Sequence, residues 1–227
     1  MTKIQELQQT KVLEQVYHSL LFRNMERSRA EAIIARVNGK IRTYEKGEIV
    51  LVEESALSEI GILLSGELCK VQVYGNGTEQ MVQKLEPGYV TGLEIAVSIK
   101  KTSPYCMYAS EKSEVYWFSV HYLEQEGMLA ECDRIHLYQE VVRFLANEDI
   151  RKYRKIEILS AKGARERIEL YLKIQENKFN SREFTINFNR EELANYLGLN
   201  RSVLSHELKK MEKDGILSVR KNHFVLL

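Results

Sequence analysis

The sequence predicts an α+β protein: an N-terminal antiparallel β jelly-roll barrel, a long dimerisation helix and a C-terminal winged helix-turn-helix. Two changes in the residue pattern along the 227 residues support this prediction. Short strand-like runs separated by turn residues fill 40–120, and a helical stretch without proline or glycine follows over 135–156. We therefore expect a barrel domain over 12–130, the long helix over 131–158 and a winged-helix domain over 159–227.

Residues 12 to about 38 precede the strand-like region and are expected to be helical. Val12 and Val16 lie four residues apart, as on one face of a helix. The Asn38-Gly39 pair then ends the pattern, as a helix stop does.

The region 40–120 has the pattern of an antiparallel sandwich or barrel, with several short strands at regular spacing. Its clearest hairpin signal is the run 71–74 followed by Gly75-Asn76-Gly77, because glycine and asparagine tolerate the positive φ of tight turns. Pro87 and Pro104 fall where turns and strand ends are expected.

The long helix carries a nearly regular seven-residue repeat. Reading every seventh position from its start gives a mostly apolar set: Ile135, Val142, Asp149 and Ile156, with Tyr138, Leu145 and Lys152 as the companion positions. Five of these seven residues are apolar, close to a coiled-coil seam, which favours pairing between two chains. The alternative is an amphipathic helix that packs on its own barrel.

The start of the C-terminal region is expected to hold a helix over 164–175, a loop over 177–181 and a short strand over 184–188. Asn189 and Glu192 then match a capping box, which predicts that the next helix starts at Arg190 and runs to Tyr196. Gly198 supplies a tight turn, and Asn200 is placed to cap a second helix.

That second helix has one apolar and one polar side. Leu204, Leu208 and Met211 form the side expected to be buried. The other side carries Arg201, Ser202, Ser205, His206 and Lys209. Two short helices around a glycine turn, the second presenting such side chains, are typical of a major-groove reader.

The runs 216–219 and 224–227 are expected to pair as a hairpin, a wing with the basic tip 220–223. Arg201, Ser202, Ser205 and His206 are expected to read bases, since arginine can bond guanine through two contacts. Phosphate contacts are expected from Lys209, Arg190 and Lys221. The alternative is a small α+β cap with a solvated basic face.

The charge distribution agrees with DNA binding. Residues 151–227 hold 17 lysines and arginines against 10 acidic residues, whereas the rest of the chain holds 16 against 22. No apolar stretch suggests a secretory signal or a membrane span, so we expect a cytoplasmic protein with no membrane partner.

The residues that metal chemistry needs are scattered. Cys69, Cys106 and Cys132 are far apart and predict no disulfide framework, zinc site or iron–sulfur site. A cupin-type metal enzyme is the alternative function for a jelly roll, but no histidine falls among the predicted strands. We expect no metal, no resident cofactor and no enzymatic activity.

At this point the chain resembles the Crp/Fnr family of bacterial transcription regulators over nearly its whole length. The resemblance rests on four segments, 44–49, 62–68, 85–92 and 192–201, which read YEKGEI, ILLSGEL, LEPGYVTG and ELANYLGLNR. It implies a cyclic-nucleotide-binding-like sensor barrel, a homodimer through the long helix, and a winged helix that reads double-stranded DNA with a two-fold symmetric operator. RNA polymerase is a further partner that the resemblance suggests.

The sequence departs from the nucleotide-binding members where their phosphate cassette would lie. Those members follow Gly-Glu with Arg-Ser on the next strand, whereas this chain has an acid one place late and no arginine in the later segment. A cyclic phosphate needs a cation or a cluster of donors, so we expect no ordinary cAMP binding. The candidate effector site consists of Gly92, Leu93, Glu94, Ser103 and Tyr105, with Lys152 and Tyr153 from the long helix.

We expect, on these grounds, a homodimeric regulator controlled by an unidentified small molecule in the barrel. The alternative is an effector-independent DNA-binding protein whose barrel is only a scaffold. His121 and His136 are interpreted as surface or packing residues rather than heme ligands. No cysteine precedes Cys69, so the N-terminal cysteine cluster of oxygen-sensing relatives is missing.

Overall fold

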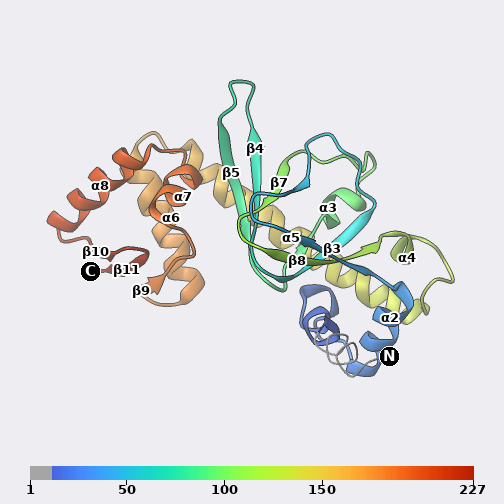
Figure 1. The fold of residues 1–227 in the computed structure, drawn as a ribbon. Coiled ribbons are helices and arrows are strands. Elements are labelled where there is room, and N and C mark those ends of the chain that lie inside the picture. Colours follow the sequence, from blue (N-terminus) through green and yellow to red (C-terminus); the bar gives the residue numbers. More distant parts are fainter. Residues whose placement is uncertain (1–11) are drawn as a thin grey trace. The chain divides into compact units, whose positions relative to one another are not determined.

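A computed structural model describes residues 12–227, which form two compact units, one ending at Glu148 and the other running from Asp149 to Leu227 (Figure 1). The first unit contains the β strands of the predicted barrel, and the second contains the short helices and a small sheet. No helix among residues 12–227 is long and apolar enough to cross a membrane.

The first helical region is broken rather than continuous. Residues 12–17 are helical, a 3-10 turn η1 covers Leu20–Phe22, and helix α2 covers Arg27–Val37. Asn38 adopts a left-handed conformation with φ of 43° and ends α2, which confirms the predicted helix stop.

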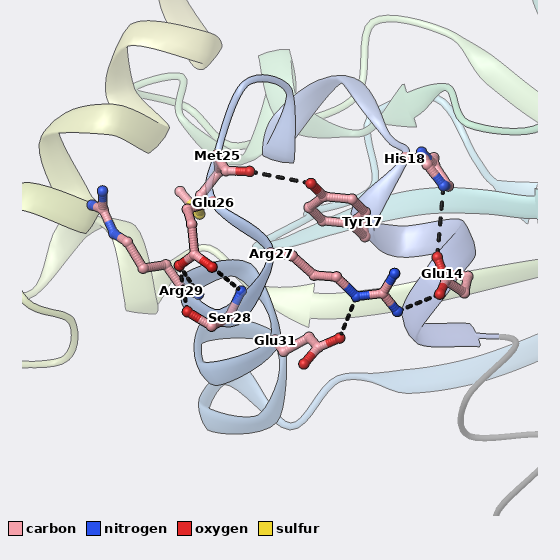
Figure 2. Close-up of polar contacts among 9 residues, drawn as sticks. All are labelled: Glu14, Tyr17, His18, Met25, Glu26, Arg27, Ser28, Arg29 and Glu31. Carbon is pink, nitrogen blue, oxygen red and sulfur yellow. Dashed lines mark hydrogen bonds and ion pairs between the residues drawn. The ribbon is translucent and has the colours of Figure 1, made fainter.

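An arginine joins the two helical pieces. Arg27 forms ion pairs with Glu14 on one side and with Glu31, at 2.8 Å, on the other (Figure 2). The hydroxyl of Tyr17 donates to the carbonyl of Met25 across the break between the pieces (Figure 2).

The predicted jelly roll is confirmed as two antiparallel four-stranded sheets with the strand orders β1-β8-β3-β6 and β2-β7-β4-β5. The strands of the first sheet are β1 (Lys40–Tyr44), β3 (Glu59–Ser65), β6 (Val90–Thr91) and β8 (Ser113–Ser119). Those of the second are β2 (Ile49–Leu51), β4 (Leu68–Val73), β5 (Glu79–Leu85) and β7 (Cys106–Ala109). Two short helices, α3 (Leu93–Ala96) and α4 (His121–Glu124), complete the barrel.

The predicted hairpin is β4 and β5, which pair with Val73 opposite Glu79 and extend beyond the neighbouring strands (Figure 1). Apolar residues from both sheets fill the interior between them, among them Leu63, Leu68 and Trp117. Alternation of side chains along each strand sends these residues inward, because successive residues of a strand face opposite sides.

Helix α5 (Glu131–Ser160) is the long helix of the sequence prediction. One face packs in the core of the first unit through the buried Leu137, Val141 and Phe144. A different face bears the predicted seam, in which Val142 has an exposed fraction of 65%. The helix therefore packs on its barrel and still presents a second apolar stripe.

The second unit contains α6 (Ala164–Phe179), α7 (Arg190–Tyr196) and α8 (Arg201–Lys213) with a three-stranded sheet in the order β10-β11-β9. Its strands are β9 (Glu183–Thr185), β10 (Leu217–Arg220) and β11 (His223–Leu226). The winged helix-turn-helix is confirmed, but two boundaries were wrong.

The first wrong boundary is the predicted loop from Asn177, since α6 continues to Phe179. The helix ends there because Asn180 adopts a left-handed conformation with φ of 48°. The second is the wing tip, which has two residues between the strands rather than four. Lys221, with φ of 56°, provides the tight reversal.

Candidate nucleic-acid interface and effector site

Helix α8 exposes the polar side that the sequence predicts. Leu204, Leu208 and Met211 are buried in the core of the second unit, which fixes the rotation of the helix about its axis. The opposite side is open to solvent at Arg201, Ser202, His206 and Lys209, with Ser205 half-buried at its edge. The helix thus presents hydrogen-bond donors and two permanent cations on one continuous surface.

The helix before it starts with a complete capping box. Oδ1 of Asn189 accepts from the backbone N–H of Glu191 and Glu192, at 2.9 and 3.0 Å, and the Glu192 carboxylate accepts from the Asn189 N–H. Gly198 follows with φ of 64°, a conformation that side chains disfavour. The capping box thus sets where α7 starts, and the turn at Gly198 leads from α7 into α8.

Arg190 links α7 to the wing. Its Nη2 donates to the carbonyl of Lys221 at 2.9 Å, and its guanidinium is half-buried. The side chain of Lys221 is exposed at the tip of the β10–β11 turn. Two predicted phosphate contacts, Arg190 and Lys221, therefore lie next to each other, and Arg190 braces the backbone of the wing.

A buried ion pair lies where the effector site was predicted. Nζ of Lys70 is 2.7 Å from Oε1 of Glu94, and the side chains are 3% and 15% exposed. The hydroxyl of Tyr105 donates to the same oxygen at 2.8 Å. The Lys70 ammonium also lies over the rings of Tyr105 and Tyr89, 4.8 and 5.6 Å from their centres.

The ionisation states of this cluster follow from its neighbours. Burial acts to raise the pKa of the Glu94 carboxyl, but the Lys70 ammonium and the hydrogen bonds to the carboxylate together outweigh burial and leave that pKa below its ordinary value. Burial, followed by the Glu94 carboxylate, raises the pKa of Tyr105 far above its ordinary value. Glu94 is therefore a carboxylate, and Tyr105 keeps its proton. Oε2 of Glu94 is buried and has no hydrogen-bond partner among the described residues.

Sequence reasoning missed Lys70. It lies in the apolar strand run Leu68–Val73, where a charged side chain is exceptional unless it is paired. That lone lysine in a buried strand was the available signal, but its partner is 24 positions away in α3. Only the folded barrel brings the two together.

The other predicted effector residues do not take part in this cluster. Leu93 is fully buried in the apolar core, and Gly92, with φ of 73°, starts α3. The Ser103 hydroxyl donates to the carbonyl of Tyr105 at 2.7 Å, so it is engaged within its own turn. Lys152 and Tyr153 lie in the second unit and are exposed on α5.

The candidate metal ligands do not gather. Among residues 12–227 no group of three or more His, Cys, Asp or Glu side chains could hold a metal ion. His121 is exposed, and the half-buried His136 has its Nε2 3.2 Å from the carbonyl of Arg23.

Comparison with known families agrees with both halves of this description. Residues 41–127 match the model of the cyclic nucleotide-binding domain, and residues 164–227 match that of the Crp-like helix-turn-helix domain. The fold and the α8 surface thus define a DNA-binding protein with a barrel of the cyclic-nucleotide-binding type. The chain belongs to the Crp/Fnr family and is a DNA-binding transcription regulator of that type.

Individual relatives are distant but cover most of the chain. Electron transport regulator A of Shewanella oneidensis is 24% identical over 82% of this chain and 74% of its own. The anaerobic regulatory protein of Pasteurella multocida is 24% identical over 82% of this chain and 67% of its own. The c-di-GMP-responsive regulator CLP of Xanthomonas campestris has the same fold, with a TM-score of 0.68 at 19% identity over 86% of this chain and 98% of that chain.

Proposed function

We propose that this regulator acts as a homodimer that pairs through α5 and binds an operator with two-fold symmetry. The main support is the stripe of exposed apolar side chains along α5: Ile135, Tyr138, Val142, Tyr153 and Ile156. Three of them, Ile135, Val142 and Ile156, have exposed fractions of 51%, 65% and 62%. Burying such side chains against a second copy is favourable, and their spacing suits two paired helices.

A dimer with this seam would carry two copies of α8. Dimeric readers of this type place their recognition helices in successive major grooves, about 34–36 Å apart along the DNA. Arg201, Ser202, Ser205 and His206 would contact base edges, while Lys209, Arg190 and Lys221 would lie near phosphates. The operator would then consist of two inverted half-sites.

The oligomeric state tests the seam. Val142→Glu places a charge in the stripe, and we expect it to convert the dimer to a monomer in sedimentation equilibrium. Asn147→Glu is the matched control, because Asn147 is exposed on α5 but lies away from the stripe. A Val142→Glu protein as dimeric as the Asn147→Glu protein would rule out pairing through this face.

For the barrel, we propose an effector that is not an unmodified cyclic nucleotide. Lys70, the buried cation beside Glu94 and Tyr105, is already neutralised by Glu94, so an incoming phosphate would have to displace a buried carboxylate. The unpaired Oε2 of Glu94 favours an effector that brings a hydrogen-bond donor.

The alternative is an effector-independent regulator whose barrel is a scaffold, and the same ion pair supports it, because the pair compensates its own buried charges without any ligand. Both proposals predict no heat of binding when the protein is titrated with cAMP in a calorimeter. A measurable heat of binding would contradict both of them. Operator affinity that is unchanged by cell metabolite extract would favour the scaffold over the effector.

A further inference from the structure

Three successive carbonyl groups at the end of α7 accept hydrogen bonds from basic side chains of the two preceding helices. Lys155 of α5 donates to the carbonyl of Tyr196. Nη1 of Arg167, on α6, donates to the carbonyls of Leu197 and Gly198 at 3.2 and 3.1 Å. The last carbonyls of a helix lack partners within it and form the negative end of its dipole, so cations stabilise them.

Lys155 also lies over an aromatic ring. Its Nζ lies 3.3 Å from the centre of the Tyr196 ring. That ring packs against Tyr171 of α6 and Phe188 at 5.7 and 5.0 Å between centres. Nε of Arg167 donates to the carbonyl of Ala161 at 3.0 Å, just after α5 ends. Side chains of α5, α6 and α7 thus meet at one place.

We propose that Lys155 is a positioning residue for DNA binding, which ties the end of α7 to the last turns of α5. The α7–α8 turn begins at that end, so its placement sets the direction in which α8 presents Arg201 and Ser202. α5 also carries the seam of the proposed dimer. A change in how two copies of α5 pair would therefore reach α8 through this contact, a consequence that rests on the proposed function.

Protonation of the Lys155 amine opposes the contact. Burial lowers the pKa of Lys155 to about 7. The titratable and charged groups around it are Tyr196 of α7, Tyr171 and Arg167 of α6, and Arg151 one turn earlier on α5. Burial raises the pKa of both tyrosines, so neither ionises near neutral pH.

The direction of the pH effect follows from linkage. When the contact between Lys155 and the Tyr196 carbonyl opens, the amine returns to water, where its pKa is about 10.4. The open state therefore binds more protons than the closed state above pH about 7, so raising the pH favours closure. Because the proposal requires the closed contact for operator binding, operator affinity should rise as the pH rises.

The test compares Lys155→Met with wild type in the full-length protein at pH 7.0 and 8.5, at one fixed salt concentration. Methionine keeps the apolar stem but cannot donate to Tyr196. We expect the variant to stay helical by circular dichroism and to bind a selected operator about 3- to 30-fold more weakly. The ratio of wild-type to variant affinity should be larger at pH 8.5. Lys173→Met, an exposed α6 lysine, is the control and should match wild type.

Equal operator affinity of Lys155→Met and wild type at both pH values would overturn the proposal. If methionine unfolds the domain, Lys155→Arg replaces it as the test variant, because arginine supplies a cation that does not titrate. The ratio of wild-type to Arg-variant affinity should then rise with pH, and a constant ratio would contradict the positioning role. Failure of the DNA-binding proposal looks different, because wild type itself would then select no operator.

Discussion

The ammonium of Lys70 lies 2.7 Å from Oε1 of Glu94 inside a barrel that is otherwise lined largely by apolar side chains. The Tyr105 hydroxyl completes the contact to the same oxygen. The buried cation of this barrel is thus paired with a carboxylate of the same barrel. A phosphate-binding site would instead leave its cation unpaired until the phosphate binds.

Removing one partner of this pair should therefore be costly. Glu94→Ala leaves a buried ammonium without a counter-ion, and we expect the free energy of unfolding to fall by about 3–5 kcal/mol. Glu45→Ala breaks the exposed pair with Lys112 and should cost at most about 1 kcal/mol. Urea denaturation of both variants measures the difference, and equal losses would contradict a buried pair.

The same pair predicts a pH dependence. Because the folded-state pKa of Glu94 lies below its ordinary value of 4.5, its contribution to stability is present above about pH 4.5 and is lost as the pH falls further. Glu94→Gln removes the titration and keeps the shape. The difference in unfolding free energy between wild type and this variant should therefore shrink from pH 7 to pH 3, whereas parallel curves would refute the assignment.

On the DNA side, Arg201 is the best candidate for reading a base. Arg201→Ala should weaken binding to the selected operator by about 1–3 kcal/mol and relax the preference at one position of each half-site. Lys209→Ala should instead weaken all sequences alike and reduce the salt slope by about 1. Fluorescence anisotropy at several salt concentrations distinguishes the two. An unchanged preference at every position would remove Arg201 from the base-reading set.

Asp149 interrupts the apolar stripe of α5, where it is exposed. In a dimer paired through this face, the two copies of Asp149 would lie in the seam and weaken it, as a polar seam residue does. Asp149→Leu should lower the dimer dissociation constant by about tenfold. Sedimentation velocity over a dilution series measures it, with Asn147→Leu as control. An equal decrease in the dissociation constant of the Asn147→Leu control would indicate non-specific association of exposed leucines instead.

The parts of the fold that local chemistry specifies could be predicted from the sequence. The capping box of Asn189 and Glu192 set the start of α7, because both hydrogen bonds lie within three residues. The end of α6 could not be set in the same way. Asn177 and Asn180 are equally plausible stops by residue type, and only the backbone shows that Asn180 takes the left-handed conformation.

The effector region shows the other limit of sequence reasoning. Glu94 and Tyr105 were expected there, but the barrel turns both toward Lys70, whose partner lies on a different element. Which side chains face one another inside a barrel depends on strand register and on bulges such as that between Lys70 and Val71. The base contacts of α8 stay predictions, since they depend on DNA as well as on this chain.

The most direct measurement is selection of bound sequences from a random duplex pool with the purified protein at a stated salt concentration. A dimer that reads DNA through two copies of α8 predicts enrichment of an inverted repeat whose half-site centres lie about 10–10.5 base pairs apart, or a multiple of that spacing. Repeating the selection with cell metabolite extract provides any effector that binding needs. If neither selection enriches a motif, or if the motif is a single unpaired site, the central claim of a symmetric operator reader is wrong.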